Sequence, residues 1–316
     1  MRKQLFPVLL LFAALHFSGT VGEHTAVAKL NAVSLPIDTT QQTMQYKNQY
    51  HPTVPSLPRG CSHNDYWQKE PLFQALSMGF MYIEADIHMI RGELYVSHKR
   101  PWRLRNAATL EQLYLDPLFQ IFQQQGFFFA DAKTPLTLMI DIKTEAEETY
   151  RVLMEKIKPY QKMLTRYKED QEIPGAIRLM ITGNRPTETM AQEKERWACI
   201  DGRPRDLGKG YSVSLMPLIS EKYSTILGWT TTFGPKSTKN ISKIKLFIES
   251  VKAENRMTRL WKIPENEQTW DWLTQEGIDL LNTDYLSRLS FYLNQRKEME
   301  KEILQEEEVI AKHKER

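Results

Sequence analysis

The chain has 316 residues, of which 41% are hydrophobic and 26% are charged, with a formal net charge of +3. These values are typical of a globular chain with one large domain or two small ones. The charge is too small to indicate nucleic acid, and we identify no basic stripe interleaved with aromatic residues, so no nucleic-acid partner is expected. Two cysteines, Cys61 and Cys199, are too few for a disulfide scaffold and fit no zinc spacing. The sequence leaves open whether they pair.

The first 22 residues have the pattern of a secretory signal peptide. Basic Arg2 and Lys3 precede an apolar run from Leu5 to Phe17, and small residues follow up to Gly22. The run is shorter than the ~20 residues of a membrane span, although an uncleaved anchor is the alternative. No later stretch is apolar enough to span a bilayer. We therefore expect a soluble mature protein, secreted or periplasmic, whose oligomeric state is open.

A polar lead at residues 23–55, with three prolines, precedes the predicted domain at 56–290. Within the domain, short runs of β-branched and large apolar residues alternate with amphipathic stretches. This alternation predicts parallel strands joined by helices. The eight predicted strands are 56–63, 80–89, 136–144, 176–184, 196–203, 210–217, 258–264 and 279–284.

Helices are predicted between these strands, at 68–79, 145–164, 237–254 and 266–277. Eight strand–helix units in roughly 250 residues match an α/β fold, the (β/α)8 TIM barrel. Residues 92–100, just after the second strand, predict an additional short strand. The chain ends in a charged helix, placed at 291–316, which we interpret as a solvated tail, with partner binding as the alternative.

Polar side chains stand at the ends of the first three predicted strands. His63 ends the first, and Glu84 and Asp86 lie two apart in the second, so their side chains point to the same side. Asp141 and Lys143 repeat this spacing in the third strand. Because barrel chemistry lies at the C-terminal ends of strands, the three carboxylates are a credible oxygen-ligand set for Mg²⁺ or Ca²⁺. A structural ion network with Lys143 is the alternative.

A second imidazole follows at His98, after another short extended run. Two histidines beside a metal suit general acid and base catalysis, because the ordinary pKa of histidine lies near neutrality. His88 shares the strand parity of Glu84 and Asp86 and stays unassigned. The other histidines are interpreted as structural or surface residues.

Taken in order, His63, the Glu84-x-Asp86 pair and the run from Gly92 to His98 resemble the glycerophosphodiester phosphodiesterase superfamily, the phosphatidylinositol phospholipase C-like barrels. The segments RLWKIP at 259–264 and LLNTD at 280–284 resemble later strands of that superfamily. The amino-acid sequence of the motifs is most similar to the altered-inheritance-of-mitochondria type of this superfamily, over about residues 57–290. Each motif alone is weak, but the ordered set is specific.

Three positions depart from the common pattern of that superfamily. The first histidine is commonly followed by Arg and Gly, where this chain has Asn64 and Asp65. The second histidine is usually followed by Asp, where this chain has Lys99. The acidic residue of the third strand is Asp141, as in the sphingomyelinase D branch, rather than Glu. These departures leave the substrate open.

The resemblance implies a phosphoric diester hydrolase of lipid metabolism that acts on a glycerophosphodiester or a phospholipid headgroup. A divalent cation, Mg²⁺ or Ca²⁺, would be held by three carboxylates, and two histidines would act as acid and base, in an order that the sequence does not decide. The implied metal ligands are Glu84, Asp86 and Asp141, and the catalytic histidines are His63 and His98. Candidate phosphate contacts are Lys143, Arg185 and Lys262.

Three other functions are compatible with parts of this pattern. A catalytically silent barrel could hold a cation or an anion on the same residues, although binding alone needs no pair of histidines. A sphingomyelinase D-like lyase would cyclise its substrate instead of hydrolysing it. A phosphomonoesterase would need a nucleophile or a second metal site, and we identify neither in the sequence.

Overall fold

A computed structural model describes residues 53–228 and 238–314 of the chain. The predicted signal peptide at residues 1–22 and most of the polar lead lie outside the described residues. Export therefore stays a prediction from the sequence alone. None of the helices in the described ranges is long and apolar enough to cross a membrane.

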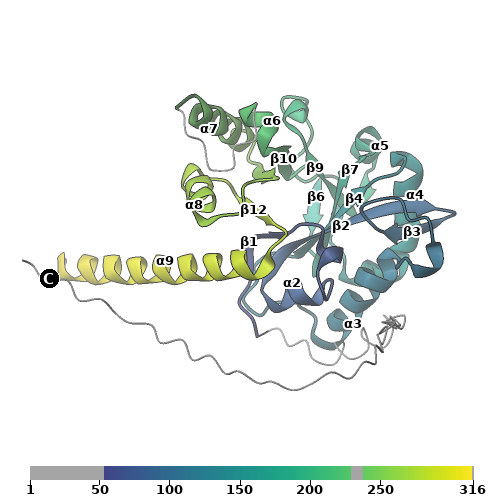
Figure 1. Ribbon diagram of the computed structural model, residues 1–316, viewed down its shortest axis with the longest axis horizontal. Helices are drawn as coiled ribbons and strands as arrows, with labels where there is room; N and C mark the ends of the chain where they lie inside the picture. The colour runs from purple at the N-terminus through teal and green to yellow at the C-terminus, as the bar shows by residue number, and fades with distance from the viewer. Residues whose placement is uncertain (1–52, 229–237, 315–316) are drawn as a thin grey trace, which may run out of the picture.

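Eight parallel strands close into a barrel surrounded by helices (Figure 1). The first strand, β1, pairs with β2 on one side and with β12 on the other, which completes the circle. The (β/α)8 expectation is confirmed. The barrel strands are β1 (Leu57–Ser62), β2 (Phe80–Ile90), β4 (Leu136–Ile142), β7 (Ile177–Gly183), β9 (Ala198–Gly202), β10 (Leu218–Lys222), β11 (Met257–Trp261) and β12 (Leu280–Thr283).

The strands β2 and β4 are buried along almost their whole length. Parallel strands with cover on both faces are selected for nearly continuous apolar sequence, which explains their runs of Ile, Leu and Met. Polar residues inside such runs, as in IEADI and MIDI, therefore stand out. Burying them costs free energy unless they find partners.

The prediction for the sixth strand was wrong in position. It was placed at 210–217, but the structure forms β10 only after Pro217, and residues 213–215 form a turn. The buried residues Leu215 and Met216 gave this segment the apolar sequence that is typical of a barrel strand. Proline has no backbone N–H to donate, so the ladder begins at the following residue, Leu218.

The second strand continues beyond the barrel and turns back into a hairpin. Its last four residues pair with antiparallel β3 (Glu93–Val96), which confirms the additional strand expected in this segment. The Ser97 amide then donates to the Asp86 carbonyl over 3.0 Å. This hairpin returns the chain to the end of β2, so that His98 follows directly beside Asp86.

The helices cover the outside of the barrel (Figure 1). The predicted helix at 145–164 ends early, because Pro159 stands in a 3₁₀ helix, η4 (Lys158–Met163), that follows α4. The α-helices are α2 (Phe73–Ser77), α3 (Asp116–Gln125), α4 (Ala146–Lys156), α5 (Thr187–Gln192), α6 (Tyr223–Leu227), α7 (Thr238–Lys252), α8 (Glu267–Glu276) and α9 (Leu286–Lys314). Short helices are η1 (Asp65–Trp67), η2 (Leu104–Asn106), η3 (Glu111–Leu115) and η5 (Pro204–Asp206), and a small sheet contains β5 (Arg166–Lys168), β6 (Gln171–Ile173) and β8 (Glu195–Arg196).

The last helix, α9, has two different parts. Its first turns bury Leu286, Leu289 and Leu293 against the barrel. From Glu298 to Glu307 every side chain is exposed, and the helix extends away from the barrel (Figure 1). The packed part therefore belongs to the domain, and the charged part is surrounded by solvent.

Both cysteines are free and buried, Cys61 in β1 and Cys199 in β9. The sequence left their pairing open, and the structure shows no disulfide between them. Burial raises the pKa of the Cys61 thiol to about 12, so this group stays a neutral packing element.

Asp65 anchors the connection between β1 and α2. Its carboxylate is fully buried and accepts hydrogen bonds from the Ser62 hydroxyl (2.8 Å), the Leu72 amide (2.6 Å) and the Tyr114 hydroxyl (2.9 Å). Leu72 has a φ of 65°, which is strained for a residue with a side chain. The hydrogen bond that the Leu72 amide donates to Asp65 offsets this strain, and the same connection carries His63.

We expect Asp65→Ala to lower the free energy of unfolding by about 2 to 4 kcal/mol, because it leaves three buried donors without their acceptor. Asp65→Asn is the matched control, since its amide oxygen can accept from the Leu72 amide and the Tyr114 hydroxyl, and its NH₂ can donate to the Ser62 hydroxyl. Urea unfolding measures both variants. An Ala variant as stable as the Asn variant would show that Asp65 is not an anchor.

The same pair of proteins tests the ionisation of Asp65. Burial raises the pKa of this carboxyl from 3.8 to about 6 in the folded protein. The folded state then holds its proton more tightly than the unfolded state, so wild-type stability should fall as the pH rises from 4 to 6. The Asn variant should lack this component of the pH dependence.

Candidate functional site

A cavity of about 320 Å³ lies at the C-terminal ends of the barrel strands. The histidines, the three carboxylates and two of the three basic residues predicted from the sequence line it together. These residues are His63, Glu84, Asp86, His98, Asp141, Lys143 and Lys262. The chain therefore gathers seven of the eight predicted side chains, from strands far apart in the sequence, into one space.

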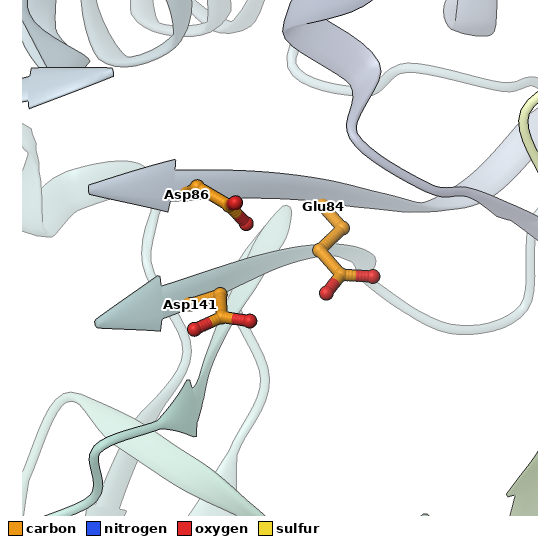
Figure 2. A group of neighbouring side chains, drawn as sticks. All are labelled: Glu84, Asp86 and Asp141. Atoms are coloured by element: carbon orange, nitrogen blue, oxygen red, sulfur yellow. The ribbon is translucent and has the colours of Figure 1, made fainter. Parts of the chain in front are cut away.

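The three carboxylates lie on two neighbouring strands. Asp86 on β2 pairs in register with Asp141 on β4, and Glu84 stands two residues earlier on β2 (Figure 2). One oxygen from each carboxylate lies within 4.8 Å of the other two. Glu84 and Asp86 are buried, and Asp141 is largely buried. Such a group can share one cation.

Each aspartate has one satisfied oxygen and one unsatisfied oxygen. Oδ2 of Asp86 accepts from the Tyr66 hydroxyl (2.8 Å) and is 3.1 Å from Nζ of Lys143. Oδ1 of Asp86 and Oδ1 of Asp141 are buried and have no hydrogen-bond partner within residues 53–228 and 238–314. Buried polar atoms are normally paired. Two unpaired carboxylate oxygens on adjacent strands therefore fit a divalent cation that prefers oxygen ligands.

Gly183, at the end of β7, makes room for one of these oxygens. A Cβ atom at this position would lie 2.0 Å from Oδ1 of Asp141, and the residue has a φ of +69°. Both the close approach and the backbone angle require glycine. The neighbouring strand is thus shaped around the free oxygen of Asp141.

Two cations neutralise part of the negative charge. Lys143 lies 2.8 Å from Asp141, and the buried Arg259 of β11 donates to Glu84 and to Asn282. Burial and the charge of Glu84 raise the pKa of Asp141 to about 6, against the opposing effect of Lys143. The two cations therefore do not fully compensate the three carboxylates, and Asp141 remains close to the negative charge of Glu84.

His63 stands at the end of β1, and its Nδ1 lies 2.7 Å from Oδ1 of Asp284. Burial lowers the pKa of His63, but the hydrogen bond to Asp284 and the charge of Glu84 raise it, and the net shift is upward. Asn64, in the left-handed region with a φ of 46°, places its amide against the same ring. The imidazole is thus oriented by the end of β12.

His98 reaches the site from the other side. Its Nδ1 lies 2.9 Å from Oδ2 of Asp86, and its ring makes an edge contact with Trp67 at 5.3 Å between centroids. An ionised carboxylate only accepts hydrogen bonds, so Nδ1 carries the proton and Nε2 is available for chemistry. Half of the side chain is exposed. His98 can therefore meet a molecule that enters from solvent.

His88 does not line the cavity. It lies on the part of β2 that pairs with β3, where its Nε2 is buried without a partner in the described part of the chain. The shared strand parity with Asp86 did not bring it into the site.

Arg185 lies outside the cavity lining, unlike the other predicted basic residues. Its Nη1 donates to the Asp201 carbonyl (2.7 Å) and to Asp206 (3.2 Å), so the side chain supports the loop after β9. Arg203 and Arg259 line the cavity instead, and the sequence reasoning missed both. An arginine within the apolar run of β11 was the signal for Arg259, because a buried charge needs a partner.

Comparison with known proteins finds one family description, the AIM6-like phosphodiesterase domain, which matches residues 53–201. "Altered inheritance of mitochondria protein 6" of Saccharomyces cerevisiae (strain YJM789) is 30% identical over 273 residues, 71% of this chain and 68% of that protein. The homologue of Arthroderma benhamiae is 26% identical over 260 residues, 73% of this chain and 82% of that protein.

Among solved structures, a glycerophosphodiester phosphodiesterase from Parabacteroides distasonis is similar, with a TM-score of 0.51 and 12% sequence identity. The similarity covers 77% of this chain and 99% of that chain. At this identity, the comparison supports the barrel fold alone.

We expect Asp284→Asn to lower the pKa of His63, because the variant removes the negative charge that holds the proton and leaves only a neutral, weaker acceptor. NMR titration of the ring protons measures this pKa, with His63→Ala to assign the signal. Asp271→Asn is the matched control, since Asp271 is similarly exposed and lies in α8. A midpoint that stays unchanged or rises in Asp284→Asn would contradict the pairing.

Proposed function

The chain belongs to the Altered inheritance of mitochondria protein 6 family, and from this premise we propose that it is a metal-dependent phosphodiesterase. Its substrate would be a glycerophosphodiester or a phospholipid headgroup. The observation that carries the proposal is the pair of buried, unpaired oxygens on Asp86 and Asp141, in a cavity that two histidines also line.

Glu84, Asp86 and Asp141 would hold a divalent cation, Mg²⁺ or Ca²⁺. When bound, the cation would supply Lewis-acid stabilisation to the phosphate oxygen. The donor set supports a hard cation, because it contains only carboxylate oxygens, and Cys61 is buried as a neutral thiol.

Two basic residues have different tasks in this proposal. Lys143 lines the cavity with its side chain a quarter exposed, so it can contact a phosphate oxygen. Arg259 is buried and bound to Glu84 and Asn282, so it positions the Glu84 carboxylate instead. Lys262 lies at the cavity wall and is a second candidate for phosphate contact.

The two histidines would divide the proton transfers. Asp284 raises the pKa of His63, which favours the protonated ring and suits the general acid that protonates the leaving alkoxide. His98 holds its proton at Nδ1 toward Asp86, so Nε2 can remove the proton from the attacking hydroxyl. The attacking hydroxyl is either water or a neighbouring alcohol of the substrate.

Purified protein with Mg²⁺ or Ca²⁺ should release product from bis-p-nitrophenyl phosphate or a glycerophosphodiester, but not from p-nitrophenyl phosphate. Activity should disappear with a chelator and return with the cation, because the bound cation would supply the Lewis-acid stabilisation of the phosphate oxygen. Full activity after exhaustive chelation would refute metal dependence. Phosphate monoester turnover would favour the phosphomonoesterase instead, and a cyclic product would identify a lyase.

His63→Ala and His98→Ala should each lower turnover by roughly 10² to 10⁴, the usual worth of a positioned acid or base. His63 does not touch a carboxylate of the metal group, so its variant should keep metal affinity. His98 contacts Asp86, so its variant could lose about tenfold in affinity. Asp86→Asn should lose metal binding and turnover together. Kinetics and calorimetric metal titration measure these effects.

His88→Gln is the matched control, because it changes a histidine on the same strand that lies outside the cavity lining. Its turnover should stay near wild type. If both other histidine variants also kept full turnover while metal bound normally, neither histidine would be the acid or the base. Metal binding by the wild type without any turnover would identify a silent cation-binding barrel.

A further inference from the structure

The segment that follows His98 is strongly basic and exposed. Residues 97–106 read SHKRPWRLRN, and no acidic residue occurs between Glu93 and Glu111. Its four cations and its tryptophan are all exposed, and the Trp102 side chain is 82% exposed. We call residues 99–105 the basic loop.

The charges of the basic loop are not neutralised by carboxylates. Lys99, Arg100, Arg103 and Arg105 form no ion pair with any part of the chain that the structure describes. Many other lysines and arginines, such as Lys156 and Arg196, do pair with an acidic side chain. The Arg103 guanidinium instead lies over the Trp102 ring, 4.1 Å from its centroid. The loop therefore presents four positive charges without a carboxylate partner in the described part of the chain, one of them over the exposed indole.

The basic loop stands at the mouth of the cavity. It begins at the residue after His98, which lines the cavity. Trp67 lines the same cavity, is 57% exposed and contacts the His98 ring. Exposed Tyr285 follows Asp284 at the end of β12, and Gln68, the residue after Trp67, donates to the Asp284 carbonyl over 3.0 Å. Exposed aromatic side chains thus follow residues that line the cavity, and the cations of the basic loop flank one of them, Trp102.

This combination fits the surface of an anionic bilayer. Tryptophan partitions to the membrane interface, where its apolar body and its N–H are both accommodated. Clustered cations next to it are attracted by anionic headgroups. A folded protein partner would need its own pocket for the indole. A single-stranded nucleic acid would need several stacking rings along a basic groove, and the loop offers one.

We propose that the basic loop binds an anionic membrane surface and places the cavity against the headgroup layer. The phosphodiester that enters the cavity is then part of a bilayer lipid rather than a freely dissolved molecule. The second statement rests on the proposed function, but membrane binding itself does not.

Vesicle flotation of the full chain tests the binding, in the presence of a chelator so that no cation can bridge protein and lipid. Wild type should float with vesicles that contain phosphatidylserine and much less with pure phosphatidylcholine, and high salt should weaken the binding. The variant K99Q/R100Q/R103Q/R105Q should bind the anionic vesicles about 100-fold more weakly. Trp102→Ala should bind about tenfold more weakly.

Two controls match these changes elsewhere on the molecule. K133Q/K162Q/K168Q/K194Q removes the same net charge from exposed lysines that precede barrel strands, at the opposite end of the barrel. Phe291→Ala removes an exposed aromatic ring from α9. Both should bind like wild type. The apolar run at residues 5–17 is common to all variants, so it cancels in the comparison.

Equal binding by wild type and the basic-loop variant would overturn the proposal, as would equal loss in the charge control. Tight binding of single-stranded RNA through the loop, without vesicle binding, would assign the loop to nucleic acid instead. Quenching of wild-type fluorescence by brominated lipids, absent in Trp102→Ala, would support insertion of this residue.

Turnover then separates the two levels of the proposal. The basic-loop variant should lose activity on a phosphodiester lipid in anionic vesicles and keep its activity on bis-p-nitrophenyl phosphate. If wild type binds vesicles but hydrolyses neither substrate, the proposed function fails while the membrane surface stands. If only the soluble substrate is turned over and vesicles are not bound, the membrane inference fails alone.

Discussion

The pairing of β2 with β4 is the constraint on which the site depends. Because Asp86 and Asp141 are in register, two carboxylates meet at the end of the barrel. Glu84, two residues before Asp86 on β2, lies beside them. The surrounding structure responds to this concentration of charge. Lys143 bridges the two aspartates, Arg259 binds Glu84, and β7 ends in a glycine where a side chain would collide. The residues around the cavity thus compensate the negative charge of the three carboxylates or leave space for their oxygens.

This arrangement weakens the fold locally. Unpaired buried oxygens and crowded like charges cost free energy, and proteins keep such features where a ligand or a reaction uses them. The contrast with Asp65 is instructive, because that carboxylate is equally buried but has three hydrogen bonds and a structural task. Burial alone thus does not mark a functional acid. Asp86 and Asp141 differ from Asp65 in that each keeps one buried oxygen without a partner in the described part of the chain.

Much of the fold and the site could be predicted from local sequence, and the failures have physical causes. Period-two spacing placed Glu84 and Asp86 on one side, and the end of an apolar run located His63 and Asp141. Arg259 was missed because spacing does not say which face of β11 points inward. The sixth strand was misplaced because the turn at 213–215 and Met216 contain apolar residues that resemble a strand sequence. Arg185 stood at a strand end, but its rotation toward Asp206 depends on a loop that no short pattern describes.

Closure of the barrel through β1 has a consequence for synthesis on the ribosome. The first strand of the barrel receives one neighbour soon, from β2, and the other only from β12, the last strand to emerge. Until then β1 presents an open edge, with the apolar surface around Cys61 uncovered, and such edges invite pairing with other chains. The barrel therefore cannot close until β12 has emerged, and β1 keeps an open edge for most of the translation of the domain.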